Sequence, residues 1–175
     1  MDSTDGGSRQ FIPVSDGIEV VDRIPVTVIL RTEALAQNRW LAERRSVVAV
    51  LPADPAAPVD LGRQDLLDQV PGARLERFDG LEIELHPDEC ESYYFNLMVE
   101  APRCFVVSRR LEDDAIEPFI VTPSFDLANA YTEGDDQVDS VALDPGLLIG
   151  IEAYVLTHFA PQERVKRRRK NWSGP

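Results

Sequence analysis

Short segments rich in β-branched and aromatic residues follow one another closely between residues 24 and 122. The first of them, "IPVTVILRTE", alternates between two faces, with Val26, Val28 and Leu30 on the same one. Several of the connections are too short for the crossovers of about a dozen residues that parallel strands require. The spacing therefore predicts an antiparallel sheet that curls toward a barrel.

Further strands are expected at "RRSVVAVLP", "ARLERF", "LEIELH", "ESYYFNLMVE", "CFVVSRR" and "EPFIVT". Asp79-Gly80 between the second and third of these predicts a hairpin turn, because Asp-Gly favours the backbone of tight β-turns. "HPDECE" is then the next turn, and the following strand has Tyr93, Phe95, Leu97 and Val99 on one face. "RQDLLDQVPG" predicts a short helix that ends at its Pro-Gly pair.

The last third of the chain predicts two helices. Ser124 is a suitable N-cap for "FDLANAYTE", which ends at Gly134. Asp144 precedes Pro145 and caps "DPGLLIGIEAYVLTHF". Apolar or aromatic side chains recur there at helical spacing and form one stripe: Leu147, Leu148, Ile151, Tyr154, Val155 and His158. We expect an α+β fold in which a short and a longer C-terminal helix pack on a barrel-like antiparallel sheet.

The 175 residues, 43% of them hydrophobic, suit one domain with a core. We expect a flexible N-terminal segment at 1–20, one globular α+β domain at 21–162 and a basic tail at 163–175. Two cysteines do not make a disulfide scaffold, and no apolar run reaches the length of about 18 residues that spans a membrane. The polar start lacks the features of a secretory signal, so the expected location is the cytoplasm.

Charge separates the tail from the rest of the chain. Six of the 18 Lys and Arg residues lie between Arg164 and Lys170, which leaves 12 against 31 acids, a net charge of −19, elsewhere. So acidic a body repels nucleic acid, and we expect no nucleic-acid partner. The tail suits electrostatic capture of a protein partner, although a merely solvated C-terminus is the simpler alternative.

The crowded stretch from His86 to Glu91 resembles a metal or thiol site at first sight. A zinc site needs four ligands, and neither His86 nor Cys90 has a second His/Cys pair in the sequence. Acidic residues at a turn are ordinarily solvated, so a hairpin turn explains the stretch better. Neither "GxxxxGK[ST]" nor "GxGxxG" occurs, so we expect no cofactor and no enzymatic activity.

Arginines around one tryptophan form the candidate interface. Exposed Trp and Arg are enriched at binding hot spots, but Trp40 could equally close the barrel end while the arginines pair with local acids. The predicted partner-binding residues, tail included, are Arg31, Arg39, Trp40, Arg109, Lys166, Arg167, Arg168, Arg169 and Lys170.

Several segments occur in an order known from one family: "IPVTVIL", "VAVLP", "LEIELH", "ESYYFNL", "FVVSRR", "EPFIVTPS", "YTEGDDQVDSVAL" and "KRRRK". Over roughly residues 22–170 the chain resembles an uncharacterised bacterial domain-of-unknown-function family (number 3305) encoded beside molybdenum formate dehydrogenases. The family pattern often has threonine at the position of Cys90, which argues against a thiol role. Some members are labelled molybdopterin-guanine dinucleotide biosynthesis protein A, but the glycine-rich loop of a nucleotidyltransferase is missing here.

The resemblance implies a non-catalytic accessory protein or subunit. Its partner would be a molybdenum-dependent, formate dehydrogenase-type oxidoreductase or the maturation machinery of that enzyme. The alternative is a molybdopterin- or nucleotide-binding protein with a pocket in the barrel, lined by His86, Glu89, Asn96 and Glu117.

Overall fold

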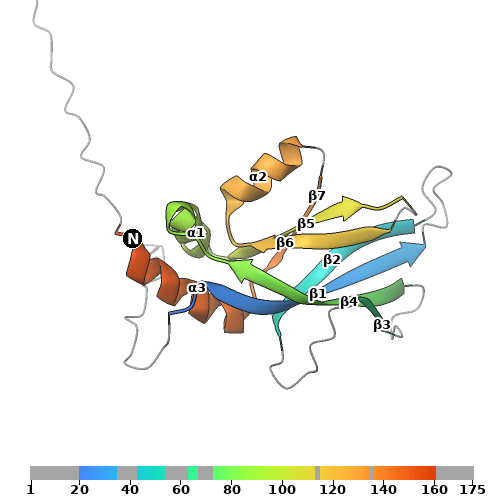
Figure 1. The fold of residues 1–175 in the computed structure, drawn as a ribbon, viewed down its shortest axis with the longest axis horizontal. Helices are drawn as coiled ribbons and strands as arrows, with labels where there is room; N and C mark the ends of the chain where they lie inside the picture. The colour runs from blue at the N-terminus through green and yellow to red at the C-terminus, as the bar shows by residue number, and fades with distance from the viewer. Residues whose placement is uncertain are drawn as a thin grey trace, which may run out of the picture.

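The computed structural model describes residues 20–34, 43–53, 63–66 (backbone only), 73–112, 115–134 and 136–160. Within these ranges a strongly curved sheet carries three helices (Figure 1). The α+β class and the barrel-like sheet are confirmed, and one more helix packs on the sheet than the sequence predicted.

The sheet is mixed. Its strands run in the order β2-β1-β4-β6-β5-β7, and β3 pairs with β4 beside this path. The strands are β1 (Arg23–Ala34), β2 (Glu43–Pro52), β3 (Arg63–Leu66), β4 (Ala73–Glu84), β5 (Arg103–Arg110), β6 (Ile116–Thr122) and β7 (Gln137–Ala142). The outer strands β2 and β7 lie against each other, where Gln137 Nε2 donates to the Arg45 carbonyl over 3.2 Å, so the barrel is nearly closed.

The sequence predicted an antiparallel sheet, but one of the pairings is parallel. β4 and β6 run parallel and meet at Ile83 and Val121. A helix and β5 separate them along the chain, and this connection is long enough for a crossover. This parallel contact is the shortest strand pairing of the described sheet, because it holds a single residue pair.

The helices are a 3₁₀ turn η1 (Pro87–Glu89), which leads into α1 (Cys90–Leu97), then α2 (Phe125–Glu133) and α3 (Pro145–His158). Both predicted caps are confirmed. Ser124 Oγ accepts from the Leu127 amide over 3.1 Å, and Asp144 Oδ1 accepts from the Gly146 amide over 2.7 Å. No helix among the described ranges is long and apolar enough to cross a membrane.

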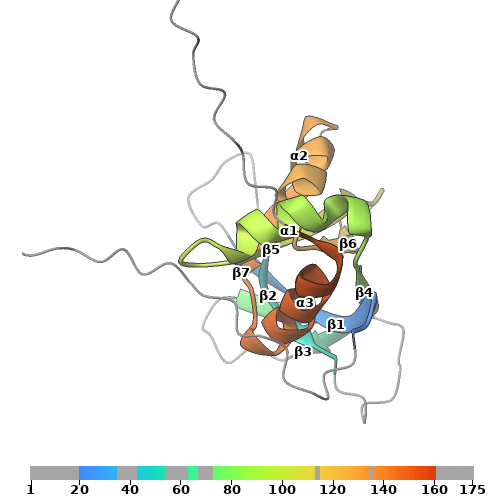
Figure 2. The ribbon, with the colours of Figure 1, turned by 90° about the vertical axis from the view of Figure 1, so that its left-hand side faces the viewer.

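Helix α3 lies across one end of the barrel, and α1 lies beside it (Figure 2). The inward face of α3 is buried among the strands: Leu147, Ile151, Tyr154 and Val155 are each at most 3% exposed. Leu148 is only half-buried and His158 is exposed, so the predicted stripe is correct in its central part. A Cβ atom on Gly150 would lie 3.0 Å from Ile24 Cδ1, so the glycine lets the helix approach β1 closely.

The segment "ESYYFNLMVE" is helical, and the predicted strand is wrong. Tyr93 and Leu97 are buried, whereas Phe95 and Val99, expected on the same strand face, are 59% and 48% exposed. Residues four apart lie on one face in both a strand and a helix, so Tyr93 and Leu97 alone did not distinguish the two. Pro87 at the start of η1 favours the helical turn that leads into α1.

The Asp79-Gly80 hairpin is also wrong, because β4 continues through this dipeptide. Two residues of β4 lie opposite Thr27 alone, which forms a β-bulge. Gly80 has φ 79°, a conformation that glycine adopts without strain in bulges as well as in turns. Thr27 Oγ1 donates to Asp79 Oδ1 over 2.7 Å and fixes the bulge.

Two smaller predictions differ from the structure as well. Residues 63–66, expected within a helix, form strand β3, which pairs with Leu75–Phe78 of β4. Residues 137–142 form β7, which the sequence did not predict as a strand. In both cases strand pairing with a distant segment decides the local conformation.

The buried thiol of Cys104 makes the free energy of unfolding depend on pH in the alkaline range. Burial raises the pKa of Cys104 to about 12, and burial also raises the pKa values of Cys90 and Tyr93. Each group is therefore protonated in the folded protein at a pH where it ionises in the unfolded chain. The stabilisation is complete below the unfolded pKa and is lost as pH rises toward the folded value.

We expect the free energy of unfolding to fall above pH 9, where unfolded thiols ionise, by about 1.4 kcal/mol per pH unit for each such group. Urea unfolding at pH 8, 9 and 10 measures this slope. Cys104→Ala removes one ionisable group and should flatten the slope by about one group's share. Parallel curves for the two proteins would contradict the assignment to Cys104.

Candidate functional site

The sheet divides along one edge of β4. One edge of β4 pairs with β1 over its whole length. The opposite edge, where the sheet divides, pairs with β3 at Leu75–Phe78 and with β6 at Ile83. Between these two pairings, residues 79–82 have no strand partner on that side within the described parts of the chain. A groove of about 400 Å³ opens there, between β4 and β6.

The polar wall of the groove comes from β4 and the turn after it. Past the bulge, Glu82 and Glu84 point outward and are exposed, while Ile83 between them is fully buried. This alternation follows from the two-residue period of a strand. His86 follows in extended conformation as the N-cap of η1 and also lines the groove.

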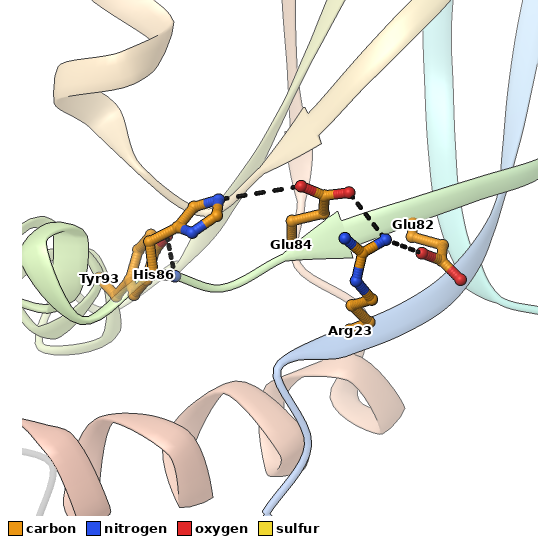
Figure 3. A network of polar contacts seen from close by, with 5 residues as sticks. All are labelled: Arg23, Glu82, Glu84, His86 and Tyr93. Atoms are coloured by element: carbon orange, nitrogen blue, oxygen red, sulfur yellow. Dashed lines mark hydrogen bonds and ion pairs between the residues drawn. The ribbon is translucent and has the colours of Figure 1, made fainter.

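Arg23 joins the two carboxylates of this wall (Figure 3). Its Nη1 lies 3.1 Å from Glu82 Oε2 and 3.0 Å from Glu84 Oε1. The hydrogen bond to Glu82 and the charge of Glu84 raise the pKa of Arg23. His86 Nε2 lies 3.9 Å from Glu84 Oε2, which makes an ion pair only when the imidazole is protonated. All of these groups are exposed, so the cluster offers charge to a ligand more than it stabilises the fold.

The apolar wall comes from β6 and α2. Phe119, Ile120 and Leu127 line it. Phe119 is an extra residue of β6, because Val107 and Ser108 of β5 pair with residues 120 and 118, and this irregularity interrupts the alternation of the strand. Its ring packs edge-on to Tyr131, at 5.8 Å between centroids, so the wall is held in place by α2.

Arg109 borders this apolar wall. Its guanidinium carbon lies 4.4 Å from the centre of the Phe119 ring, a cation–π contact, and its Nε lies 3.9 Å from Glu117 Oε2. Arg109 was predicted from the sequence for partner binding and Glu117 for cofactor binding. The structure brings the two together beside Phe119, which lines the groove.

The four residues of the alternative cofactor pocket are not gathered in one place. His86 lines the groove, and Glu117 lies beside Arg109. Glu89 accepts a hydrogen bond from the Ser124 hydroxyl, and Asn96 bonds the backbone of Arg103 and Pro123. Glu89 and Asn96 therefore connect α1 to the sheet and to the start of α2.

Of the remaining predicted interface residues, Arg31 alone lies in the described part of the chain. Arg31 lies on β1 and pairs with Glu33 of the same strand. Arg39, Trp40 and Lys166–Lys170 lie outside the described residues.

The side chains of the stretch from His86 to Glu91 lie in different surroundings. His86 is exposed, whereas Cys90 is buried and points its Sγ toward the His86 carbonyl, 3.8 Å away. In the part of the chain that the structure describes, no three His, Cys, Asp or Glu side chains cluster as metal ligands.

A groove with one apolar and one charged wall suits binding of an extended peptide segment.

Glu82, Glu84, Phe119 and Leu127 were missed as functional candidates. The alternation of "LEIELH" already marked the two glutamates as outward-facing. No pattern in the sequence pointed to Phe119 and Leu127, because the parallel contact between β4 and β6 brings them to the glutamates.

Searches of curated proteins and of solved structures gave no significant match. A family model described as "Protein of unknown function (DUF3305)" matches residues 25–169. This range includes all the described strands, except for the first two residues of β1. The chain belongs to this family.

Proposed function

We propose that this protein is a non-catalytic accessory protein that binds an extended segment of a larger protein in the groove between β4 and β6. The observation that carries the proposal is the division of the sheet, which leaves an open groove with a charged and an apolar wall. Grooves of this kind recognise short segments of partner proteins through side-chain pockets beside a strand edge.

The groove favours particular chemistry in the bound segment. An apolar side chain fits against Phe119 and Leu127, and a basic one fits beside Glu82 and Glu84. Pro118 in β6 has no backbone N–H, so pairing along that strand is interrupted. Side-chain contacts therefore supply more of the recognition than a continuous hydrogen-bond ladder would.

The resemblance described above supplies the proposed partner. It is a molybdenum-dependent, formate dehydrogenase-type oxidoreductase or a component of its maturation machinery. Aromatic and arginine side chains dominate binding energy at interfaces, which makes Phe119 and the neighbouring Arg109 the expected anchors.

Site-specific photo-crosslinking in the native host tests this docking mode. With p-benzoylphenylalanine in place of Phe119, we expect a covalent adduct with a subunit of the oxidoreductase, identified by mass spectrometry. The matched control places the same residue at Phe95, which is 59% exposed on α1. Adducts from position 95 but not from 119, with both proteins folded, would contradict docking in the groove.

A binding measurement with the identified partner gives the size of the effect. Phe119→Ala should raise Kd about tenfold or more, as expected for a hot-spot residue. Phe95→Ala should leave Kd within about twofold, since exposed residues outside an interface contribute little.

A further inference from the structure

Carboxylates continue from the groove toward the end of α3. Glu82 and Glu84 lie in the groove, and Asp88 follows His86 in the η1 turn. Asp22 adjoins the same turn, because its carbonyl accepts from the Leu85 amide over 2.7 Å. We call Asp22, Glu82, Glu84 and Asp88 the acidic track; Arg23 offsets one of its four charges.

Two members of the acidic track act on helix α3, the last element of the described chain. The negative charges of Asp22 and Asp88 contribute, after burial and Cys90, to raising the pKa of Tyr154 in α3. The Tyr154 ring stacks on His158, with 4.1 Å between centroids, in the last turn of this helix. The charges of Asp22 and Asp88 therefore act on the part of α3 that leads into its last turn.

The described chain ends beside α1, which follows the groove residue His86 along the chain. Phe159 packs on Tyr94 of α1, with 5.2 Å between ring centroids, and α1 directly follows the η1 turn. Residues 161–165 can span about 17 Å when extended, whereas the eight residues of α1 cover about 12 Å. The six cations between 164 and 170 are therefore within reach of the acidic track.

We propose that the basic tail, residues 164–170, binds the acidic track of its own chain and covers the charged wall of the groove. The charges are complementary, six cations against four carboxylates that Arg23 only partly neutralises. Arginine guanidinium groups match carboxylates with two parallel hydrogen bonds. A tethered segment also acts at an effective concentration in the millimolar range, so weak individual contacts suffice.

This binding regulates the groove. A tail on the charged wall competes with the basic side chains of a partner segment, a consequence that rests on the proposed function. The tail then acts as a reversible cover and not as the direct partner contact expected from the sequence.

Zero-length crosslinking of the full chain tests the tail contact without any partner. Lys166 and Lys170 are the chain's only lysines, so carbodiimide-induced amide bonds from a lysine start in the tail. We expect intramolecular bonds from them to Glu82, Glu84 or Asp88, identified by mass spectrometry of the monomer. About 0.5 M salt should reduce their yield several-fold, because it screens exposed charges.

Two matched double variants make the result specific. Glu82→Gln/Glu84→Gln should lower the total yield of intramolecular lysine crosslinks at least threefold. Glu33→Gln/Glu43→Gln removes two similarly ion-paired carboxylates from the distant ends of β1 and β2 and should leave it unchanged. Crosslinks spread evenly over acidic residues, or found only between isotopically distinguished copies, would overturn the proposal.

Deletion of residues 161–175 then separates the two proposals. If the tail covers the groove, the deletion should increase crosslinking of the partner from position 119 several-fold. A decrease would overturn the covering role and support direct capture by the tail. Partner adducts at position 119 without lysine crosslinks to the acidic track would leave the proposed function intact and overturn only the tail contact.

Discussion

Replacing Asn96 with alanine should lower the free energy of unfolding by about 3 kcal/mol, because its side chain makes several hydrogen bonds in a buried place. Asn96 Nδ2 donates to the carbonyls of Arg103 and Pro123 over 2.7 and 2.9 Å, and its Oδ1 accepts from the Arg103 amide over 2.9 Å. The alanine variant leaves these three backbone groups without this partner and loosens α1 from the sheet.

Urea unfolding followed by circular dichroism measures this loss. Asn129→Ala is the matched control, because Asn129 is exposed on α2 and the change should alter stability by about 0.5 kcal/mol or less. A similar small effect for Asn96→Ala would mean that water replaces the lost hydrogen bonds and that α1 does not depend on them.

Replacing Ile151 with alanine should cost between about 2 and 5 kcal/mol, the range for truncating a fully buried isoleucine. Ile151 is 0% exposed and belongs to the face of α3 that closes the barrel end. The variant removes apolar contacts and leaves a cavity between the helix and the strands, which the rigid sheet refills only in part.

The same helix offers the control for this prediction. Ile149 is 54% exposed, so Ile149→Ala should change the free energy of unfolding by less than about 1 kcal/mol. Equal losses for the two variants would show that α3 is covered on both faces or does not close the barrel. Thermal and urea unfolding of the two proteins under identical conditions distinguish these outcomes.

Sequence patterns were most reliable where one local rule acted alone. Ser124 and Asp144 cap their helices because a short polar side chain satisfies free amides within its own segment. β1 alternates as predicted, with Val26, Val28 and Leu30 completely buried, because one face of this strand lies on the core.

Predictions failed where one pattern is compatible with two structures. An Asp-Gly pair permits positive φ in a turn or in a bulge, and the pairing of β4 with β1 on both sides of Gly80 selects the bulge. The spacing of Tyr93 and Leu97 is common to a strand and a helix, and the apolar space beside α3 selects the helix. Neither choice could be made from the segment itself.

The candidate site was only partly accessible from the sequence. His86 and Arg109 were named as functional candidates and lie in or beside the groove, although they had been assigned to different sites. Glu89 and Asn96 were predicted to line a cofactor pocket in the barrel, but they bond neighbouring elements of the fold. The groove itself exists only because β4 meets β6 at one residue pair.

The sequence by itself determined the α+β class, most strands, the two capped helices and the contrast between an acidic body and a basic tail, since each depends on neighbouring residues or on charge counts. The tertiary structure decided the helix after His86, the bulge at Gly80 and the groove beside Glu82. These depend on contacts between segments far apart in the chain, and the free energy of such contacts overrides local preference.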